Sequence, residues 1–233
     1  MFELQRKVQR KQIRREHGES HSYLRVLDEE EVLPFGNLRF AWDTTLRSGG
    51  GMVRRLPSFL DFFVMPLQGA VDIRLDTAER TCKIEPGRVA RIRLRDPGSV
   101  RLWAPEAPSR FLEIGLGVPA EGHTAPAEPI EWRDFRDESG RWPKFTAVLA
   151  PDGAEDSLAA GYDAHLFRWF LSAGEQVRYE TVPPHRLFLI LLRGALQAGK
   201  FRLLEGDSLR GVGEPELDLV VNRSSDLVLI ETS

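Results

Sequence analysis

The sequence contains few histidines, one cysteine and no long apolar run. Cys82 is the single cysteine among 233 residues, which excludes a disulfide within the chain and fits a reducing compartment. No apolar run approaches the roughly 20 residues that a membrane-spanning helix needs. The basic residues 1–7 are not followed by the apolar stretch of a secretory signal. These features predict a cytoplasmic protein with no membrane partner.

A strong charge of either sign is also lacking. The formal net charge is −3, which provides no overall attraction to nucleic acid or to anionic lipid. Arg91, Arg93 and Arg95 fall on one face of an expected strand, where charged side chains commonly protect the edge of a sheet. The basic residues 6–15 are interpreted as a terminal extension or strand with solvated charges. We therefore expect no nucleic-acid partner.

Apolar and polar residues alternate along most of the chain, as is typical of half-buried strands. Val71, Ile73 and Leu75, for example, are interleaved with charged residues. Turn signals such as Glu85-Pro86-Gly87 separate these runs at short spacing. The pattern predicts an all-β sandwich or barrel with little helix, in which only residues 156–162 could form a helical turn or two.

Two blocks of the chain share one plan. Leu67-Gln68-Gly69-Ala70 follows an apolar strand in the first block, and Leu192-Arg193-Gly194-Ala195 does so in the second. The proline-rich segment between the blocks carries aromatic residues, which indicates a packed connection rather than a flexible linker. The sequence therefore predicts a duplicated barrel, with a first barrel over residues 1–132, a connection over 133–160 and a second barrel over 161–233.

Several segments follow one another in the order and spacing of a known family. The run Gly49-Gly50-Gly51 leads into a strand, Gly69 follows at the family's interval, and Glu85-Pro86-Gly87 forms the next turn. Residues 150–158 and 163–169 continue the likeness. Together these segments resemble the pirins, and the resemblance covers most of the chain. It implies a bicupin, which consists of two tandem antiparallel β-barrels of the double-stranded β-helix, or jelly-roll, type.

The resemblance implies four places at which a metal would be bound. Pirins known as enzymes hold iron or another divalent metal by His-x-His after the glycine run and by a later His-x-Glu, and they cleave flavonols with dioxygen. Here those places hold Arg55, Pro57, Val100 and Leu102. None of these side chains offers a lone pair to a metal. No catalytic residue of the family can be carried over, and we expect no metal or other cofactor.

The second barrel offers no better metal site. The corresponding places fall near Glu180 and Val182, with Arg186 further along the chain. A carboxylate beside an arginine favours a salt bridge over metal binding. His185 follows two prolines at the start of a strand, and it is interpreted as a surface or capping residue.

The arginines around the first metal place suggest a different ligand. Arg55 occupies a place that would point into the barrel, and Arg54 and Arg101 lie close to it. A buried arginine needs a partner, because an unpaired buried charge is very costly. That partner would be Asp61 or a bound carboxylate or phosphate. Two interpretations stay open: these four residues bind a small anion in the first barrel, or the arginines lie outside the barrel or pair internally.

Three classes of function are compatible with these observations. The favoured one is a pirin-like bicupin with a degenerate metal site, which binds a small ligand or a protein partner in a regulatory role. The first alternative is an oxidoreductase that resembles quercetin 2,3-dioxygenase and holds iron or another divalent metal with non-standard ligands. The second alternative is a structural or assembly role. Whether the chain is an enzyme is left open by the sequence.

Overall fold

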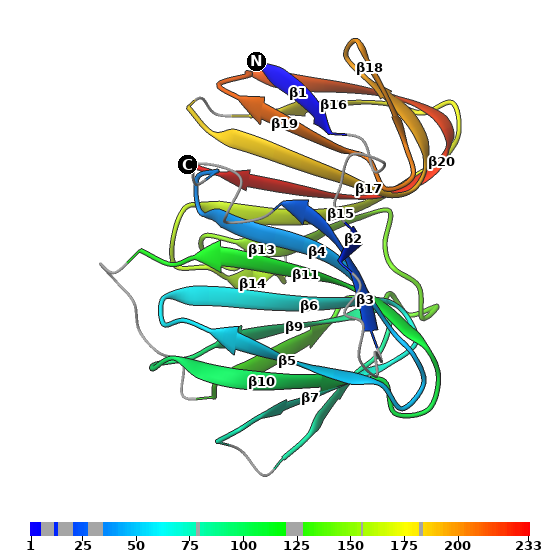
Figure 1. Cartoon of the computed structure of the whole chain (residues 1–233). Helices are drawn as coiled ribbons and strands as arrows, with labels where there is room; N and C mark the ends of the chain where they lie inside the picture. Colours follow the sequence, from blue (N-terminus) through cyan, green and yellow to red (C-terminus); the bar gives the residue numbers. More distant parts are fainter. Residues whose placement is uncertain are drawn as a thin grey trace. The chain divides into compact units, whose positions relative to one another are not determined.

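The computed structural model describes residues 1–5, 12–13, 21–27, 35–77, 80–119, 128–154, 156–181 and 184–233. These residues form strands, turns and loops but no helix, so the predicted all-β fold is confirmed (Figure 1). The chain divides into two compact units. We call residues 11–34 and 38–136 the first barrel, and residues 1–10, 35–37 and 137–233 the second barrel.

The first barrel is built from two antiparallel sheets. A seven-stranded sheet has the order β12-β9-β6-β11-β4-β3-β2, and a four-stranded sheet has the order β5-β10-β7-β8. The strands are β2 (Gln12–Ile13), β3 (His21–Leu27), β4 (Leu38–Leu46), β5 (Gly51–Leu56), β6 (Leu60–Gln68), β7 (Val71–Leu75), β8 (Cys82–Ile84), β9 (Arg88–Arg93), β10 (Gly98–Trp103), β11 (Ser109–Gly117) and β12 (Ile130–Asp134).

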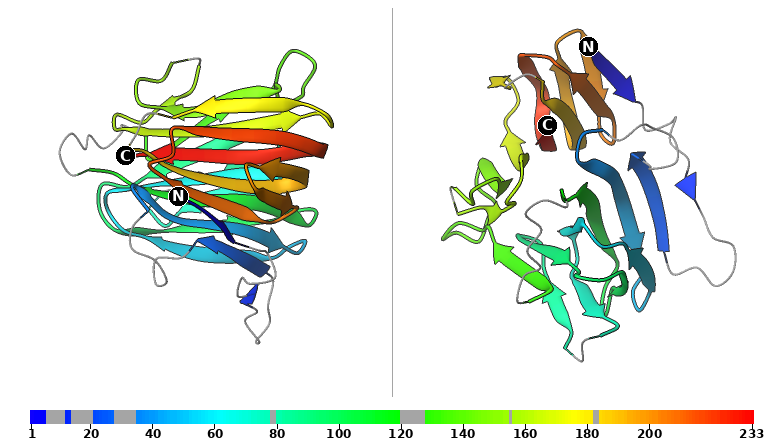
Figure 2. Two further views of the ribbon diagram at one scale, coloured as in Figure 1. Left: turned by 90° about the horizontal axis from the view of Figure 1, so that it is seen from above. Right: turned by 90° about the vertical axis from the view of Figure 1, so that its left-hand side faces the viewer.

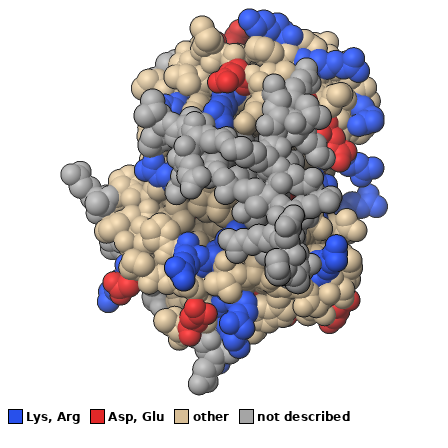
Figure 3. Space-filling view, viewed as in Figure 1, with Lys and Arg blue, Asp and Glu red and all other residues tan. Residues whose placement is uncertain are grey.

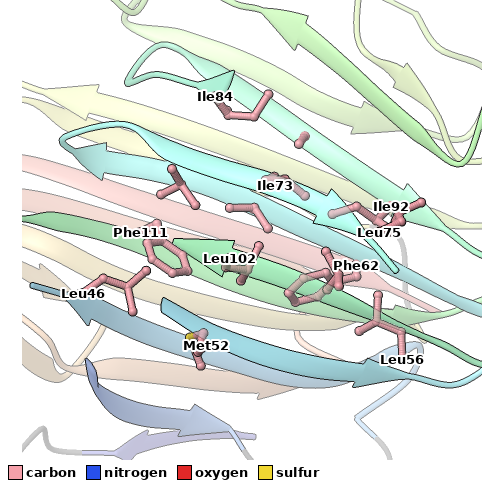
Figure 4. Close-up of a cluster of buried hydrophobic side chains, with 14 of the residues drawn as sticks. Leu46, Met52, Leu56, Phe62, Ile73, Leu75, Ile84, Ile92, Leu102 and Phe111 are labelled. Carbon is pink, nitrogen blue, oxygen red and sulfur yellow. The ribbon is translucent and has the colours of Figure 1, made fainter. Parts of the chain in front are cut away.

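The core of the first barrel follows from the alternation in its strands. Every second residue of a strand points to the same side, so Leu60, Phe62 and Val64 of β6 enter one apolar cluster. The same cluster receives Ile73 from β7 and Leu102 from β10. Figure 4 shows Phe62, Ile73 and Leu102 among the apolar side chains that both sheets contribute to this cluster. The interior of this barrel is therefore predominantly apolar.

The second barrel contains one strongly bent sheet of nine strands. Its main order is β1-β19-β17-β20-β15-β13-β14, and β16 and β18 pair with β20 and β17 respectively. The strands are β1 (Phe2–Gln5), β13 (Phe145–Ala150), β14 (Leu158–Ala159), β15 (Ala164–Leu171), β16 (Gln176–Glu180), β17 (Arg186–Ala198), β18 (Phe201–Leu204), β19 (Ser208–Val212) and β20 (Glu216–Thr232). Register shifts where β17 meets β20 mark β-bulges, and bulges allow such long strands to bend.

The unit boundaries differ from the predicted ones. The first strand, β1, pairs with β19 and so belongs to the second barrel, as the blue and orange strands in Figure 2 show. β13 lies within the predicted connection over 133–160, but it pairs with β15 in the sheet of the second barrel. The segment considered for a helical turn contains the short strand β14. Most of the basic segment 6–15 lies outside the described residues.

The charges visible on the described surface are mixed. On the face shown in Figure 3, Lys and Arg side chains stand in several separate groups, with Asp and Glu side chains between some of them. None of the described residues belongs to a helix with the length and hydropathy that a membrane span requires.

Candidate functional site

The four places implied for metal ligands lie in two different environments. Arg55 and Pro57, at and after the end of β5, are exposed. Val100 and Leu102 on β10 are 0% exposed and belong to the apolar core of the first barrel. Figure 4 shows Leu102 among the core side chains. These four side chains therefore do not converge on one point.

Arg54, rather than Arg55, faces the interior of the first barrel. The reason is the period of two along β5, in which Met52 and Leu56 are core residues and Arg54 lies on the same side. The expectation that Arg55 points inward is thus wrong by one residue. The structure instead places an arginine side chain, 13% exposed, against the buried side of the barrel.

Glu113 of β11 neutralises this arginine. Arg54 Nε donates to Glu113 Oε2 at 2.7 Å and Arg54 Nη2 donates to Glu113 Oε1 at 2.8 Å. The Thr44 hydroxyl of β4 also donates to Glu113 Oε1. The Glu113 side chain is 0% exposed, so its charge is compensated entirely by protein groups. Such a two-pronged pair is among the stronger geometries for a charged hydrogen bond.

An aromatic stack covers the Arg54 guanidinium. Its central carbon lies 4.2 Å from the ring centroid of Trp42, and Trp42 in turn stacks on Phe40 with centroids 4.2 Å apart. The face of an indole attracts a cation. Arg54 therefore contacts Glu113 on one side and Trp42 on another. This arrangement agrees with the alternative interpretation, in which the arginines pair with other residues of the protein.

The other two candidate residues lie away from Arg54. Asp61 is buried on the side of β6 opposite the core residues Leu60 and Phe62, and it forms a two-pronged ion pair with Arg93 of β9. Arg101 is exposed on β10. The structure therefore does not gather Arg54, Arg55, Asp61 and Arg101 into one pocket. Binding of an anion by these residues stays a prediction.

In the second barrel, the places considered for a metal are also dispersed. Glu180 is exposed at the end of β16, and Val182 lies outside the described residues. Arg186 at the start of β17 has its guanidinium carbon 5.9 Å from the ring centroid of Phe35. Among the residues that the structure describes, no group of three His, Cys, Asp or Glu side chains is arranged to hold a metal ion.

A buried polar cluster in the second barrel was not anticipated from the sequence. Its centre is Glu231 of β20, which is 5% exposed. The Tyr179 hydroxyl donates to Glu231, as does the Thr181 hydroxyl at 2.9 Å, and His185 Nδ1 lies 2.7 Å from Glu231 Oε1. The other ring nitrogen of His185 lies 3.0 Å from Asp163. His185 is thus mostly buried between two carboxylates, so its interpretation as a surface residue is wrong.

The cluster alters the acidity of its members. Burial alone would raise the pKa of Glu231, but the hydrogen bonds from Tyr179, His185 and Thr181 outweigh it, so that pKa lies below its ordinary value. Burial, followed by the hydrogen bond to Glu231, raises the pKa of Tyr179 far above its ordinary value. At neutral pH the cluster therefore consists of a carboxylate that accepts bonds and a phenol that donates one.

His165 borders this cluster. It is the cross-strand neighbour of Glu231, and its ring stacks on Phe167 with centroids 5.7 Å apart. Its Nδ1 atom is buried and has no hydrogen-bond partner among the described residues. The one sequence signal for this cluster is Glu231 itself, because it occupies an inward position in the row that contains the core residues Leu227 and Leu229.

Comparison with known proteins agrees with this architecture. The family described as the quercetinase C-terminal cupin domain matches residues 147–232. Among curated protein sequences, none matches the chain significantly. The structure of YhhW from Escherichia coli is similar with a TM-score of 0.86 at 17% identity, over 100% of this chain and 98% of that one.

Two further solved structures are similar over the whole chain. Bacterial pirin YhhW from Escherichia coli in complex with nickel(II) has a TM-score of 0.81 at 17% identity, with 100% of this chain and 99% of that one covered. A quercetin 2,3-dioxygenase from Acinetobacter baumannii has a TM-score of 0.73 at 11% identity, with 100% and 79% covered. In sequence, the second barrel therefore matches the quercetinase C-terminal cupin family, and the whole chain shares the bicupin fold of these solved structures.

Proposed function

We propose that this pirin-type bicupin has lost metal-dependent dioxygenase activity in its first barrel and acts as a small-ligand-binding or regulatory protein. The observation that carries the proposal is the Arg54–Glu113 pair inside the first barrel, together with apolar Val100 and Leu102 at two implied ligand places. We further propose a cytoplasmic location, which fractionation of cells would test.

The chemistry of metal binding supports the loss. A catalytic metal needs about three protein ligands that converge on one point and leave a position open for the substrate. Val100 and Leu102 cannot donate electrons, and Arg55 and Pro57 are exposed. Arg54 also engages the buried carboxylate of Glu113 in an ion pair, so this carboxylate is not free to bind a metal.

Metal analysis of the purified chain tests the proposal directly. The chain would be produced in medium supplemented with iron, nickel, copper and zinc, and its metal content measured by mass spectrometry. We expect clearly substoichiometric metal and no consumption of quercetin in the presence of dioxygen and added nickel. YhhW from Escherichia coli, which has been crystallised with nickel(II), is the matched control for metal loading. Stoichiometric metal with quercetin turnover would overturn the proposal.

The alternative of a metal enzyme with non-standard ligands would have to use the Glu231 cluster, whose described side chains are not arranged to hold a metal ion. His165 and His185 both lie next to Glu231, and His165 Nδ1 is buried without a partner among the described residues. If metal were found, His165→Gln would remove it under this alternative. Unchanged metal content in that variant would exclude the cluster as the metal site.

A further inference from the structure

A cleft of about 680 Å³ opens in the second barrel, away from the buried Glu231 cluster. Its volume falls within the range of small-molecule sites, about 300–1,000 Å³. The cleft is formed at the end of β15, at the bulged parts of β17 and β20 and at the turn between β18 and β19. The lining residues are Phe170, Leu171, Ser172, Arg193, Glu205, Arg223, Ser224, Ser225 and Asp226.

The backbone around Gly194 shapes this cleft. Gly194 has a φ of +103°, and a Cβ atom added there would lie 2.4 Å from the Ser224 carbonyl oxygen and 2.4 Å from Ser225 Oγ. Only glycine lets the two strands approach so closely. The register of β17 against β20 shifts on both sides of Arg193. Bulges of this kind redirect side chains and are common next to binding sites.

In the described part of the chain, the cleft lining carries more arginine side chains without an ion-pair partner than acidic side chains without one. Asp226 is already engaged, because Arg168 Nε and Nη2 donate to its carboxylate at 3.1 and 2.9 Å. Arg168 is 4% exposed, so this ion pair is largely buried. Among the described residues, neither Arg193 nor Arg223 forms an ion pair. The exposed carboxylate of Glu205 is the remaining acidic group in the lining.

Two hydrogen bonds fix the positions of polar side chains on one side of the cleft. Arg223 Nη2 donates to the Gly194 carbonyl at 3.1 Å, which holds its guanidinium against the bulge. Ser224 Oγ accepts a hydrogen bond from the backbone N–H of Ala173 at 3.3 Å, so the hydroxyl proton of Ser224 points in another direction. The half-buried ring of Phe170 adds an apolar wall. Donors beside an apolar wall suit an organic molecule that carries anionic oxygens.

We propose that this cleft binds a small organic dianion, either a dicarboxylate or a phosphate monoester, through Arg193 and Arg223. The inference deepens the proposed ligand-binding function and rests on it. Each guanidinium can donate two parallel hydrogen bonds to a carboxylate or phosphate group. A dianion engages both arginines, whereas a monocarboxylate engages one. Binding weakens as salt concentration rises, because the arginines are exposed.

Titration calorimetry of the full chain at low salt tests this inference with succinate, phenyl phosphate, inorganic phosphate and acetate. We expect succinate or phenyl phosphate to bind more tightly than inorganic phosphate and acetate, and the tighter of the two identifies the ligand class. Arg193→Gln and Arg223→Gln should each weaken that binding about tenfold or more. Arg101→Gln removes the same charge from the first barrel and should leave binding unchanged. Both cleft arginines are exposed, so thermal unfolding should confirm that the variants fold.

Three results would overturn the inference. One is the absence of binding by every probe up to about 10 mM, which corresponds to less than about 3 kcal/mol of binding free energy. Another is equal loss of binding in Arg193→Gln and Arg101→Gln. A third is tightest binding of inorganic phosphate. The inference and the proposed function fail separately: a metal-free chain without anion binding refutes this site alone, whereas stoichiometric metal with quercetin turnover refutes the loss of enzyme activity.

Discussion

The Arg54–Glu113 pair offers the sharpest test of how the first barrel is held together. Glu113→Gln keeps the size of the side chain but removes the negative charge that neutralises Arg54. Glu113 is 0% exposed and Arg54 is 13% exposed, so water cannot readily replace the lost carboxylate. Breaking a buried pair by removing one partner typically costs about 3–5 kcal/mol. We expect a loss in the free energy of unfolding within that range, measured by urea denaturation.

A double replacement distinguishes the cost of leaving one buried charge unpaired from the contribution of the ion pair itself to stability. Arg54→Met with Glu113→Leu removes both charges and retains apolar volume, so we expect a smaller loss, about 2 kcal/mol or less. If each single replacement costs about 3–5 kcal/mol, the double-mutant cycle should show a coupling of at least about 4 kcal/mol. Arg101→Met, on the exposed side of β10, should change stability by less than about 0.5 kcal/mol and serves as the control. Additive effects, or a loss below about 1 kcal/mol in Glu113→Gln, would refute the described pairing.

Three other substitutions probe the rest of the structure. Leu102→Ala should lower stability by about 2–5 kcal/mol, because the side chain is 0% exposed in the apolar core; urea denaturation that shows no loss would place Leu102 elsewhere. Glu231→Gln should be destabilising at neutral pH. The folded pKa of Glu231 lies below its ordinary value of 4.5, so the stabilisation is complete above that pH and is lost as the pH falls through the folded pKa. Thermal unfolding of both proteins from pH 7 to pH 3 should show the difference shrinking in acid, and a constant difference would contradict this assignment. Gly194→Ala should be far more destabilising than Gly174→Ala. Both glycines have positive φ, but the new Cβ would collide with the Ser224 carbonyl at Gly194, whereas no atom beyond the chain neighbours lies within 4 Å of it at Gly174. Equal melting temperatures of the two variants would refute the close approach of β17 and β20.

The strands could be predicted from the sequence because the signal for a half-buried strand is local. Val71, Ile73 and Leu75 alternate with polar residues, and they form β7 with all three side chains buried. The same rule applied to Met52 and Leu56 would have placed Arg54 inside the barrel. Counting from the family's motif placed Arg55 there instead, and a shift of one residue moves a side chain to the opposite face.

The partners of polar residues could not be predicted in this way. Arg54 and Glu113 are separated by 59 positions, and Glu231 and Thr181 by 50. No local pattern links such residues, because their approach depends on which strands become neighbours. The same reason applies to β1, a strand of four residues that pairs with β19 near the other end of the chain.

By itself, the sequence determined the all-β character of this protein, its duplicated plan and the absence of electron-donating side chains at Arg55, Pro57, Val100 and Leu102. These properties follow from residue type and from the period of two along a strand. Only the tertiary structure decided that Arg54 is neutralised by Glu113 and that Arg193 and Arg223 share a cleft. The physical reason is that charge compensation and cavity shape arise from contacts between distant strands, and those contacts exist only once the sheets have formed.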